Sequence, residues 1–287
     1  MPSGRKRTRK DKSSDATGAS RQRTDGADGG GGAAAAATAT KGGADADEAE
    51  GPSSSTPLLG LLTRCFTEVD GYRIAREVRA KQRRAGVFLE GITYGEVDIG
   101  DFARVLQTVG PARGETFVDV GSGTGKAVLC AAACHPLRLA RGIEILPELH
   151  AAASEALGVA RAEKTAGGAT LGAALADGGT EVELHCGDAF AQDEPWTAWA
   201  ATADVVFATT TCFTDDLHAK FGAAVAEMRV GSRLIVTTQA LTSDAFVLLG
   251  EGRLRCAKGS LAYFAYRKVR EGGGGAAAAA AAAASAD

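Results

Sequence analysis

A glycine-rich turn between a short apolar segment and an alanine-rich segment constrains the fold of this chain more than any other feature. Residues 116–120 read Thr-Phe-Val-Asp-Val, which predicts a buried strand, and residues 126–134 read Lys-Ala-Val-Leu-Cys-Ala-Ala-Ala-Cys, which predicts a helix. The turn Gly121-Ser122-Gly123-Thr124-Gly125 joins them. Glycines let a backbone turn sharply and approach a ligand closely. Because ligands of alternating strand-helix folds bind at the carboxyl ends of the strands, the turn predicts a ligand site.

Strands and helices continue to alternate after this turn. The hydrophobic pattern predicts strands at 139–145, 182–186, 204–208 and 233–238, helices at 147–163 and 215–228, and two closing strands at 254–256 and 261–269. Upstream, it predicts a helix over 57–84 that is broken near Gly71, and a short helix over 100–109 that ends at Gly110. This order favours an α/β fold: a doubly wound, Rossmann-like, mostly parallel sheet with an antiparallel edge, preceded by a small helical subdomain.

Two segments allow finer predictions. Residues 166–179 are rich in Gly and Ala and read as a loop inserted at the surface. In the last strand the side chains alternate between the two faces of the sheet. One face would carry Leu261, Tyr263 and Ala265, and the other Ala262, Phe264 and Tyr266.

The spacing of the glycines distinguishes three uses of such a turn. A P-loop requires Gly at position 120 and Ser or Thr at position 127, where this chain has Val120 and Ala127. A dinucleotide fingerprint requires Gly or Ala at position 126, where this chain has Lys126. Both patterns fit poorly. The third pattern is D-x-G-x-G-x-G with an acid at the end of the next strand, and Asp119 and Glu144 supply both acids.

This third pattern resembles motif I of class I methyltransferases that use S-adenosylmethionine (SAM). The resemblance implies a class I methyltransferase sheet in which the glycine turn packs against the amino-acid part of SAM. Glu144 would hold the ribose hydroxyls, and Asp119 would lie near the methionine ammonium. Asp188, at the end of the third strand, would meet the adenine edge. A structural glycine turn with exposed acids is the alternative.

A second motif narrows the resemblance. Thr93-Tyr94-Gly95-Glu96 lies upstream of the turn, at a spacing that resembles the disruptor-of-telomeric-silencing (Dot-one) family of histone H3 lysine methyltransferases. Residues 141–144 and 204–213 also resemble this family, and the likeness spans residues 58–270. It implies a lysine N-methyltransferase that acts on nucleosomes and regulates chromatin. The Tyr-Gly-Glu segment could instead be an ordinary turn.

The family resemblance assigns roles to individual positions. Tyr94, Gly95, Glu96 and Val97 would contact the methionine end of SAM. The wall of the cofactor site would be Phe117, Val118, Asp119, Val120, Gly121, Ser122, Gly123, Thr124, Gly125 and Lys126. Glu144 would bind ribose, and Asp188 and Ala189 would lie on the adenine side. Thr209, Phe213 and Tyr263 would be the catalytic residues that line the lysine channel, although both aromatic residues could equally be ordinary core residues.

One position departs from the family pattern. The family normally has Asn after the fourth strand, where this chain has Thr209 in the run Phe-Ala-Thr-Thr-Thr-Cys-Phe. Threonine has one hydroxyl and lacks the carbonyl and paired donors of an amide. Activity could therefore be reduced, altered in target or lost. A catalytically impaired SAM- or nucleosome-binding module is the second hypothesis, and a methyltransferase for another protein or a small molecule is the third.

Composition predicts the domain boundaries. Residues 1–56 contain no aromatic residue and are rich in Gly, Ala and charge, so we expect a disordered tail, basic and then acidic. The Gly/Ala run 272–287 should be disordered as well. Between them we expect a helical subdomain over 57–110 with the SAM-covering loop, and the SAM-binding methyltransferase domain over 111–271.

Charge and cysteine content suggest partners and a compartment. The net charge is −3, but residues 5–23 carry eight cations against two acids, which indicates a nuclear localisation signal or a DNA-contacting tail. A solvated tail without a function is the alternative. The six cysteines and four histidines show no metal spacing, which suggests free thiols and no metal. We expect a nuclear, monomeric protein with no membrane span, whose partners are histone H3 in nucleosomes and DNA phosphate.

Overall fold

The computed structural model describes residues 57–86, 94–163, 171–175, 179–191 and 195–272. The predictions for Thr93, for the tail 1–56 with its basic segment and for the tail from 273 onwards fall outside these residues. All that follows concerns the described part of the chain.

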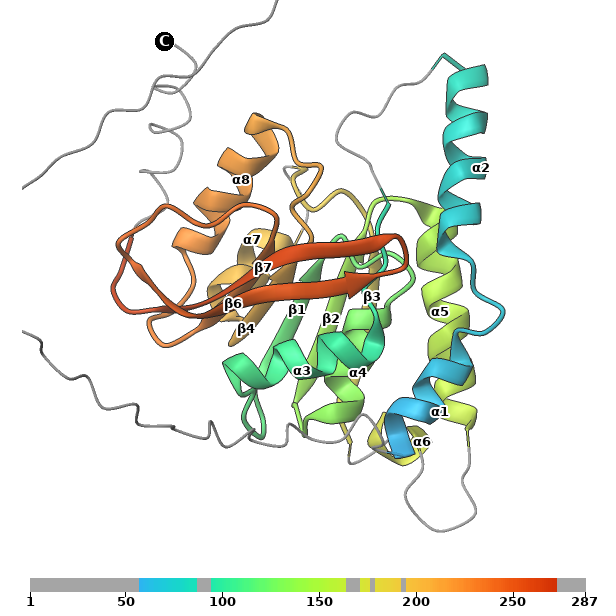
Figure 1. Cartoon of the computed structure of the whole chain (residues 1–287), viewed down its shortest axis with the longest axis horizontal. Helices are drawn as coiled ribbons and strands as arrows, with labels where there is room; N and C mark the ends of the chain where they lie inside the picture. The colour runs from blue at the N-terminus through green and yellow to red at the C-terminus, as the bar shows by residue number, and fades with distance from the viewer. Residues whose placement is uncertain (1–56, 87–93, 164–170, 176–178, 192–194, 273–287) are drawn as a thin grey trace, which may run out of the picture. The chain divides into compact units, whose positions relative to one another are not determined.

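Seven strands in the described residues form one sheet in the order β3-β2-β1-β4-β5-β7-β6 (Figure 1). The strands are β1 Thr116–Val120, β2 Leu139–Glu144, β3 Glu181–Cys186, β4 Val205–Ala208, β5 Arg233–Thr237, β6 Phe246–Cys256 and β7 Gly259–Lys268. The first five are parallel, β7 runs antiparallel to β5, and β6 pairs antiparallel with β7. This confirms the α/β fold, the mostly parallel sheet and the antiparallel edge. The strand order reverses between β1 and β4, which is where doubly wound sheets bind ligands.

Helices cover both faces of the sheet. They are α1 Pro57–Cys65, α2 Gly71–Arg84, α3 Ile99–Val109, α4 Lys126–Cys134, α5 Pro147–Ala162, α6 Leu171–Ala174, α7 Trp196–Thr202 and α8 Asp215–Ala226. Helices α1, α3, α4, α5 and α6 contribute buried side chains to the core on one face, while α7 and α8 contribute to the core on the other. The sheet is therefore the middle of three layers.

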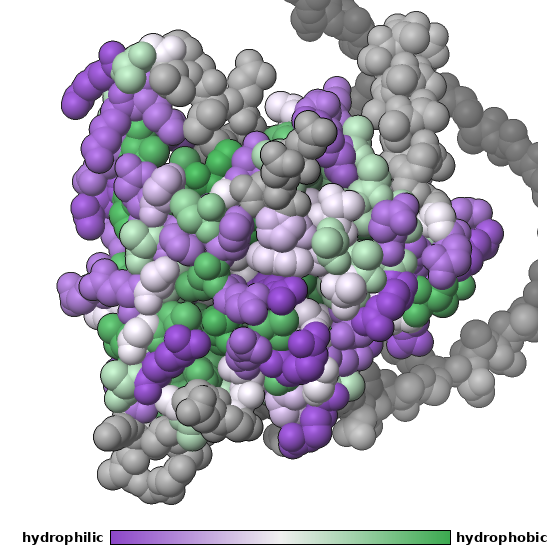
Figure 2. Space-filling view, turned by 180° about the vertical axis from the view of Figure 1, so that it is seen from behind, coloured by the Kyte–Doolittle hydropathy of each residue, from purple (hydrophilic) through white to green (hydrophobic). Residues whose placement is uncertain are grey.

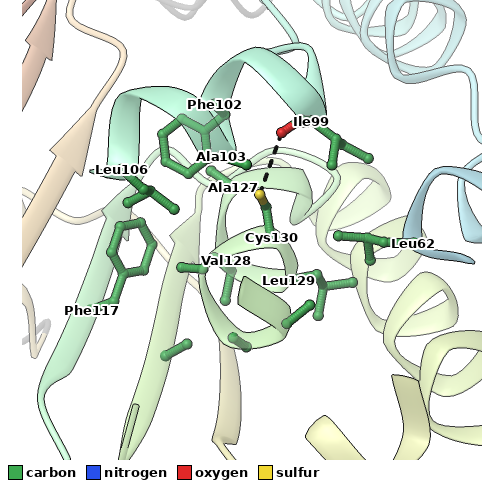
Figure 3. Close-up of a cluster of buried hydrophobic side chains, with 14 of the residues drawn as sticks. Leu62, Ile99, Phe102, Ala103, Leu106, Phe117, Ala127, Val128, Leu129 and Cys130 are labelled. Atoms are coloured by element: carbon green, nitrogen blue, oxygen red, sulfur yellow. Dashed lines mark hydrogen bonds between the residues drawn. The ribbon is translucent and has the colours of Figure 1, made fainter. Parts of the chain in front are cut away.

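The core on the first face centres on α3, α4 and β1. Phe102 of α3 lies over Phe117 of β1 and Phe207 of β4, with ring centroids 6.3 and 4.7 Å apart. Figure 3 shows these helices meeting around Cys130, whose thiol donates to the carbonyl of Ile99. Because this cluster packs α3 against α4 and the sheet, the helix before the glycine turn shares one core with the sheet.

Local sequence explains where the helices begin and end. The side chains of Asp70, Asp98 and Thr214 accept backbone N–H groups in the first turns of α2, α3 and α8, which satisfies donors that the helices leave open. Gly110 ends α3 in the left-handed conformation, as its position predicted. Gly71 begins α2, so the predicted break in the first helical segment is confirmed.

Two short helices were not predicted. The predicted surface loop over 166–179 is wrong at residues 171–174, which form α6, and Leu171 and Leu175 are fully buried against the first core. Helix α7 was also missed, although Trp196 is buried and stacks on Phe221 of α8. Segments this short show too little periodicity for detection, and tertiary burial decides their conformation.

Candidate functional site

The glycine-rich turn lies at the carboxyl end of β1, at the point where the strand order reverses. Gly121, Gly123 and Gly125 have φ angles of 80, 55 and 82°, which only glycine adopts readily. The N–H groups of Gly121 and Ser122 both donate to the carbonyl of Ile143 at 2.9 Å, which holds the turn against the end of β2. The three glycines of the turn thus bring backbone without side chains to the edge where β1, β2 and β4 end.

Two adjoining cavities open at this edge. The larger has a volume of about 250 Å³ and lies between the ends of β1, β2 and β3, the residues after β4 and the start of α8. The smaller, about 20 Å³, lies between the glycine turn, Phe207 and the loop before α3. Tyr94, Gly95, Gly121 and Thr209 line both. Tyr94 and Gly95 of the upstream motif, Gly121 of the glycine turn and Thr209 after β4 therefore lie at one place.

Glu144 lines the larger cavity at the end of β2. One carboxylate oxygen accepts the N–H of Gly123 at 2.8 Å and the other accepts the N–H of Leu146 at 2.8 Å. Burial raises the pKa of this carboxyl, and hydrogen bonds from backbone N–H groups partly oppose the rise. The two bonds fix the carboxylate in one orientation, and each oxygen keeps a further lone pair for a ligand hydroxyl.

Two more carboxylates lie at the cavities. Asp119 lines the smaller one and is only 3% exposed, so burial, followed by repulsion from Glu144, raises its pKa well above the ordinary value. Asp188 is exposed and lines the larger one, where its carboxylate accepts the N–H of Phe190 at 3.0 Å. The site therefore presents carboxylates on three strand ends, an arrangement suited to a ligand with hydroxyl and cationic groups.

The segment Tyr94-Gly95-Glu96 is held onto the glycine turn by its side chains. Glu96 Oε1 accepts the hydroxyl of Tyr94 at 2.6 Å and that of Thr124 at 3.0 Å, and Oε2 lies 2.9 Å from Lys126 Nζ. Burial, followed by the charge of Glu96, raises the pKa of Tyr94, so this phenol stays protonated and donates. Hydrogen bonds and an ion pair therefore hold the segment that was predicted to cover the cofactor against the glycine turn that was predicted to bind it.

Close packing leaves no room for larger side chains around this segment. A Cβ atom added to Gly123 would lie 2.8 Å from the Tyr94 ring, and one added to Gly71 would lie 2.2 Å from the Tyr94 hydroxyl. Tyr72 packs edge-on against Tyr94, with ring centroids 5.3 Å apart. The first turn of α2 and the glycine turn thus hold Tyr94 between them.

The residues after β4 form the other wall. Thr209 lines both cavities, while Thr210 donates to the carbonyl of Thr237 at 2.6 Å and the hydroxyl of Thr211 lies 2.7 Å from that of Thr238. These bonds tie the segment to the end of β5. Thr238 has a φ of 73°, a left-handed conformation that is costly for a β-branched residue.

Phe213 belongs to an aromatic group at the rim of the larger cavity. Its ring lies 5.6 Å from Phe190, 5.6 Å from His218 and 5.9 Å from Phe221, each in an edge-on arrangement. With Cys212 and Leu217 it gives this end of the cavity an apolar wall. Phe213 therefore both packs against core residues and lines the larger cavity.

The structure brings most of the predicted site residues together. The larger cavity takes in Val120, Glu144, Asp188, Ala189 and Phe213, the smaller takes in Glu96, Val97, Asp119, Ser122, Gly123, Thr124 and Lys126, and both take in Tyr94, Gly95, Gly121 and Thr209. Among the described residues, four predicted ones line neither cavity: Phe117, Val118, Gly125 and Tyr263. Phe117 and Val118 face the two cores, and Gly125 precedes α4.

Tyr263 lies apart from the cavities. It is 6% exposed, belongs to the first core, and stands in register with Thr237 of β5 and Gly252 of β6. The structure thus places it as a core aromatic residue, the alternative that its residue type left open.

Several lining residues were not among the predicted ones. They are Ile143, Ile145, Leu146, Leu149, Gly187, Phe190, Cys212 and Leu217 in the larger cavity and Ala127 and Phe207 in the smaller. Leu146 and Phe190 each follow an acidic residue at a strand end by two positions. That spacing is the signal that could have found them, because residues just beyond a strand end face the same edge as the acid.

Two wider properties of the described residues bear on the function. They hold no group of three or more His, Cys, Asp or Glu side chains that could bind a metal ion. Their helices include none with the length and apolar character needed to cross a membrane.

Comparison with solved structures returned chains of low sequence identity. TrmN from Thermus thermophilus is 18% identical over 60% of this chain and 49% of its own length, with a TM-score of 0.40, so the alignment spans about half of TrmN. An RNA methyltransferase from Salinibacter ruber, solved in complex with S-adenosyl-L-homocysteine, is 21% identical over 59% of this chain and 91% of its own, with a TM-score of 0.39. No curated protein matches the sequence.

A family comparison gives a more specific result. The family model described as "Histone methylation protein DOT1" matches residues 88–249, which is more than half of the chain. This range contains the Tyr94 segment, the glycine turn, Glu144, Asp188 and the residues after β4. The chain therefore belongs to the DOT1 histone methylation family.

Proposed function

We propose that this protein binds SAM in the two cavities and transfers its methyl group to a lysine of histone H3 in nucleosomes. The observation that carries this proposal is the meeting of the glycine turn, Glu144 and the Tyr94 segment around one cavity. Membership of a histone methylation family supports it.

The residues present fit SAM. A Cβ atom added to Gly121 would meet no protein atom within 4 Å, although this residue lines both cavities, so the absent side chain leaves room for a ligand. Glu144 can accept hydrogen bonds from ribose hydroxyls, and Asp119 is placed to attract a cationic group. Ile143, Leu146 and Leu149 offer an apolar surface for an adenine ring.

Bound SAM supplies a methyl group on a cationic sulfonium, and the protein has to orient a neutral amine toward it. A free lysine has a pKa of about 10.4. Phe213, Cys212 and Leu217 form an apolar wall, where loss of hydration favours the neutral amine. Holding the two reactants in line can contribute several kcal/mol.

Thr209 should affect the rate of methyl transfer. It lies at the junction of the two cavities, where an amide side chain in the family pattern would supply a carbonyl and two donors. Threonine supplies one hydroxyl. A module that binds SAM without efficient transfer is therefore a second candidate, and Thr209→Asn distinguishes the two.

Methyl transfer from labelled SAM tests the proposal directly. The full chain is incubated with reconstituted nucleosomes or free histones, and mass spectrometry locates the modified residue. We expect label on H3, and more on nucleosomes than on free histones. Binding of SAM without transfer, with transfer restored by Thr209→Asn, would favour the non-catalytic module. Absence of transfer to H3 by both proteins would overturn the histone assignment.

A matched pair of glycine variants tests the cofactor site. Gly121 and Gly231 have φ angles of 80 and 93°, and a Cβ atom at either would meet no other atom within 4 Å. Gly121→Val and Gly231→Val therefore introduce similar backbone strain, but Gly121 alone of the two lines the cavities. Calorimetry should show loss of SAM binding for Gly121→Val and retention for Gly231→Val.

We also propose a nuclear location and contact of residues 5–23 with DNA phosphate. Eight cations in this segment support both roles. A fluorescent fusion of the full chain should accumulate in nuclei and lose this accumulation when residues 5–12 are replaced by Gly and Ser.

A further inference from the structure

Helix α2 carries a concentrated positive charge on the surface. Its 14 residues contain six cationic side chains, Arg73, Arg76, Arg79, Lys81, Arg83 and Arg84, against the single carboxylate of Glu77. All of these except Arg79 are exposed. Figure 2 shows the corresponding edge of the molecule, at the upper left, covered by hydrophilic side chains.

The charge lies on one face of the helix. Gly71, Ala75 and Val78 are buried, and Val78 packs against Leu146 and Leu149. With about 3.6 residues per turn, Arg73, Arg76, Arg83 and Arg84 point away from that buried face. The outward face carries no exposed large apolar side chain, so it is unsuited to insertion into a lipid surface, which requires one.

Stability of the helix does not account for this distribution. Cations near the carboxyl end of a helix interact favourably with its dipole, which explains Lys81, Arg83 and Arg84. Near the amino end the dipole favours acids, yet the first turn of α2 contains no acid and Arg73 and Arg76 lie in the first two turns. These two cations oppose the dipole.

Few acids neutralise the outward face. Arg73 pairs with Glu77 at 3.1 Å, and Lys81 lies 3.8 Å from Glu148 of α5. Within the described residues, Arg76, Arg83 and Arg84 form no ion pair. At least three guanidinium groups are thus available to an anion.

We infer that the outward face of α2 is a docking surface for the phosphate backbone of double-stranded DNA. This inference rests on the proposed function, because a nucleosomal substrate brings DNA to the enzyme. The helix is about 21 Å long at about 1.5 Å per residue, enough to face several phosphates of one strand. Guanidinium groups are well suited to phosphate oxygens, since they donate two parallel hydrogen bonds.

The position of α2 connects this surface to the cavity. Its first residue, Gly71, lies against Tyr94, and its buried residue Val78 packs on Leu146 and Leu149, which line the larger cavity. DNA on the outward face would therefore lie about one helix diameter, roughly 10 Å, from the residues that line the cavity. A protein segment emerging from such DNA could reach the cavity without leaving the complex.

Binding of a labelled DNA duplex to the full chain tests the inference. Fluorescence anisotropy is measured over a range of KCl concentrations for the wild type and for Arg76→Glu/Arg83→Glu/Arg84→Glu. We expect affinity to fall at least about tenfold at moderate salt, and the slope of log affinity against log salt to become shallower by about 2 to 3. Residues 5–23 are unchanged in both proteins and contribute equally.

A charge-matched variant provides the control. Arg113, Arg267 and Arg270 are exposed, and Arg113 and Arg267 lie at the opposite end of the parallel strands, near the start of β1 and beside the start of β5. Arg113→Glu/Arg267→Glu/Arg270→Glu changes the net charge equally and should weaken DNA binding far less. Thermal unfolding should show that both variants are folded.

Three results would overturn the inference: an unchanged affinity in the α2 variant, equal weakening in both variants, or competition by poly-glutamate that matches competition by DNA. The last result would indicate an acidic protein as the partner. DNA binding is measured without SAM, and SAM binding is measured separately by calorimetry. Failure of the α2 surface is therefore distinguishable from failure of the proposed methyltransferase function.

Discussion

Lys126 Nζ lies 2.9 Å from Glu96 Oε2, and this ion pair joins the first residue of α4 to the segment that covers the glycine turn. The Glu96 side chain is 8% exposed and that of Lys126 is 18% exposed. Glu96 also accepts hydrogen bonds from Tyr94 and Thr124, so one carboxylate holds three groups around the predicted methionine end of the site. The negative charge of Glu96 therefore has to be balanced by Lys126 if the segment Tyr94-Gly95-Glu96 is to keep its position.

Lys126→Met should loosen this segment. The substitution leaves a buried carboxylate without its cation, so we expect the free energy of unfolding to fall by about 2 to 3 kcal/mol. SAM affinity should fall by about tenfold, since Tyr94 and Gly95 line both cavities. Urea unfolding and calorimetry measure the two effects. Glu96→Gln/Lys126→Met removes both charges and should recover part of the lost stability; equal stability of the two variants would contradict the role of the pair.

Thr238→Gly should weaken activity while leaving the stability of the fold nearly unchanged. The φ of 73° costs Thr238 about 1 to 2 kcal/mol, and glycine relieves this strain but loses about 1 kcal/mol in chain entropy. Stability should therefore change by less than about 1 kcal/mol. Loss of the hydroxyl that lies 2.7 Å from Thr211 should loosen the segment with Thr209 and Phe213 and raise KM for the protein substrate.

The control for Thr238→Gly is Thr238→Asn, because asparagine tolerates the left-handed conformation and keeps a polar side chain. It should retain more of the activity than Thr238→Gly. The dissociation constant of SAM should be unchanged in both variants. A weakened SAM affinity in either would show that the threonine contacts act on the cofactor site instead.

Asp119 should make the protein less stable as pH rises. Burial, followed by repulsion from Glu144, raises the pKa of Asp119 in the folded state. The folded protein then holds a proton that the unfolded chain releases above a pH of about 4, so this group lowers stability progressively as pH rises from there toward the folded pKa. Asp119→Asn removes this contribution, and its gain in stability relative to wild type should be larger at pH 8 than at pH 5.

Urea unfolding at the two pH values measures this difference. Asp244→Asn is the control, because it makes the same change of residue type at a side chain that is 75% exposed. That variant should follow the wild-type pH dependence. An Asp119→Asn protein that also follows it would show that Asp119 loses no solvation in the folded state.

Lys268→Met should destabilise the fold without affecting the site. Lys268 is fully buried, and its ammonium donates to the carbonyls of Ala226 and Met228 at the end of α8. Methionine leaves those carbonyls without a donor, so we expect a loss of about 2 kcal/mol. Lys220→Met, at an exposed lysine paired with Asp216, should cost less than about 1 kcal/mol. Chemical denaturation measures the loss of stability in both variants. Similar losses would argue against a stabilising role for the hydrogen bonds from Lys268 to the carbonyls at the end of α8.

The sequence by itself determined the elements with a strong local signal. Strand β1 and helix α4 have the predicted bounds, because a run of buried apolar residues, a glycine turn and an alanine-rich segment each favour one conformation. The resemblance to class I methyltransferases assigned the acids at the ends of β1, β2 and β3 to one cofactor, and all three line the two cavities because parallel strands end at the same edge of a sheet. Short elements such as α6 and α7 were missed, because one or two turns show no period.

Only the tertiary structure decided which aromatic residues reach the cavity. Phe213 and Tyr263 are equivalent by residue type, but the segment after β4 ends at the cavity, whereas the register of β7 with β5 and β6 turns Tyr263 into the core. The pairing of Lys126 with Glu96, 30 residues apart, likewise depends on how α4 packs beneath the covering segment. Such contacts arise from long-range packing, for which local sequence carries no signal.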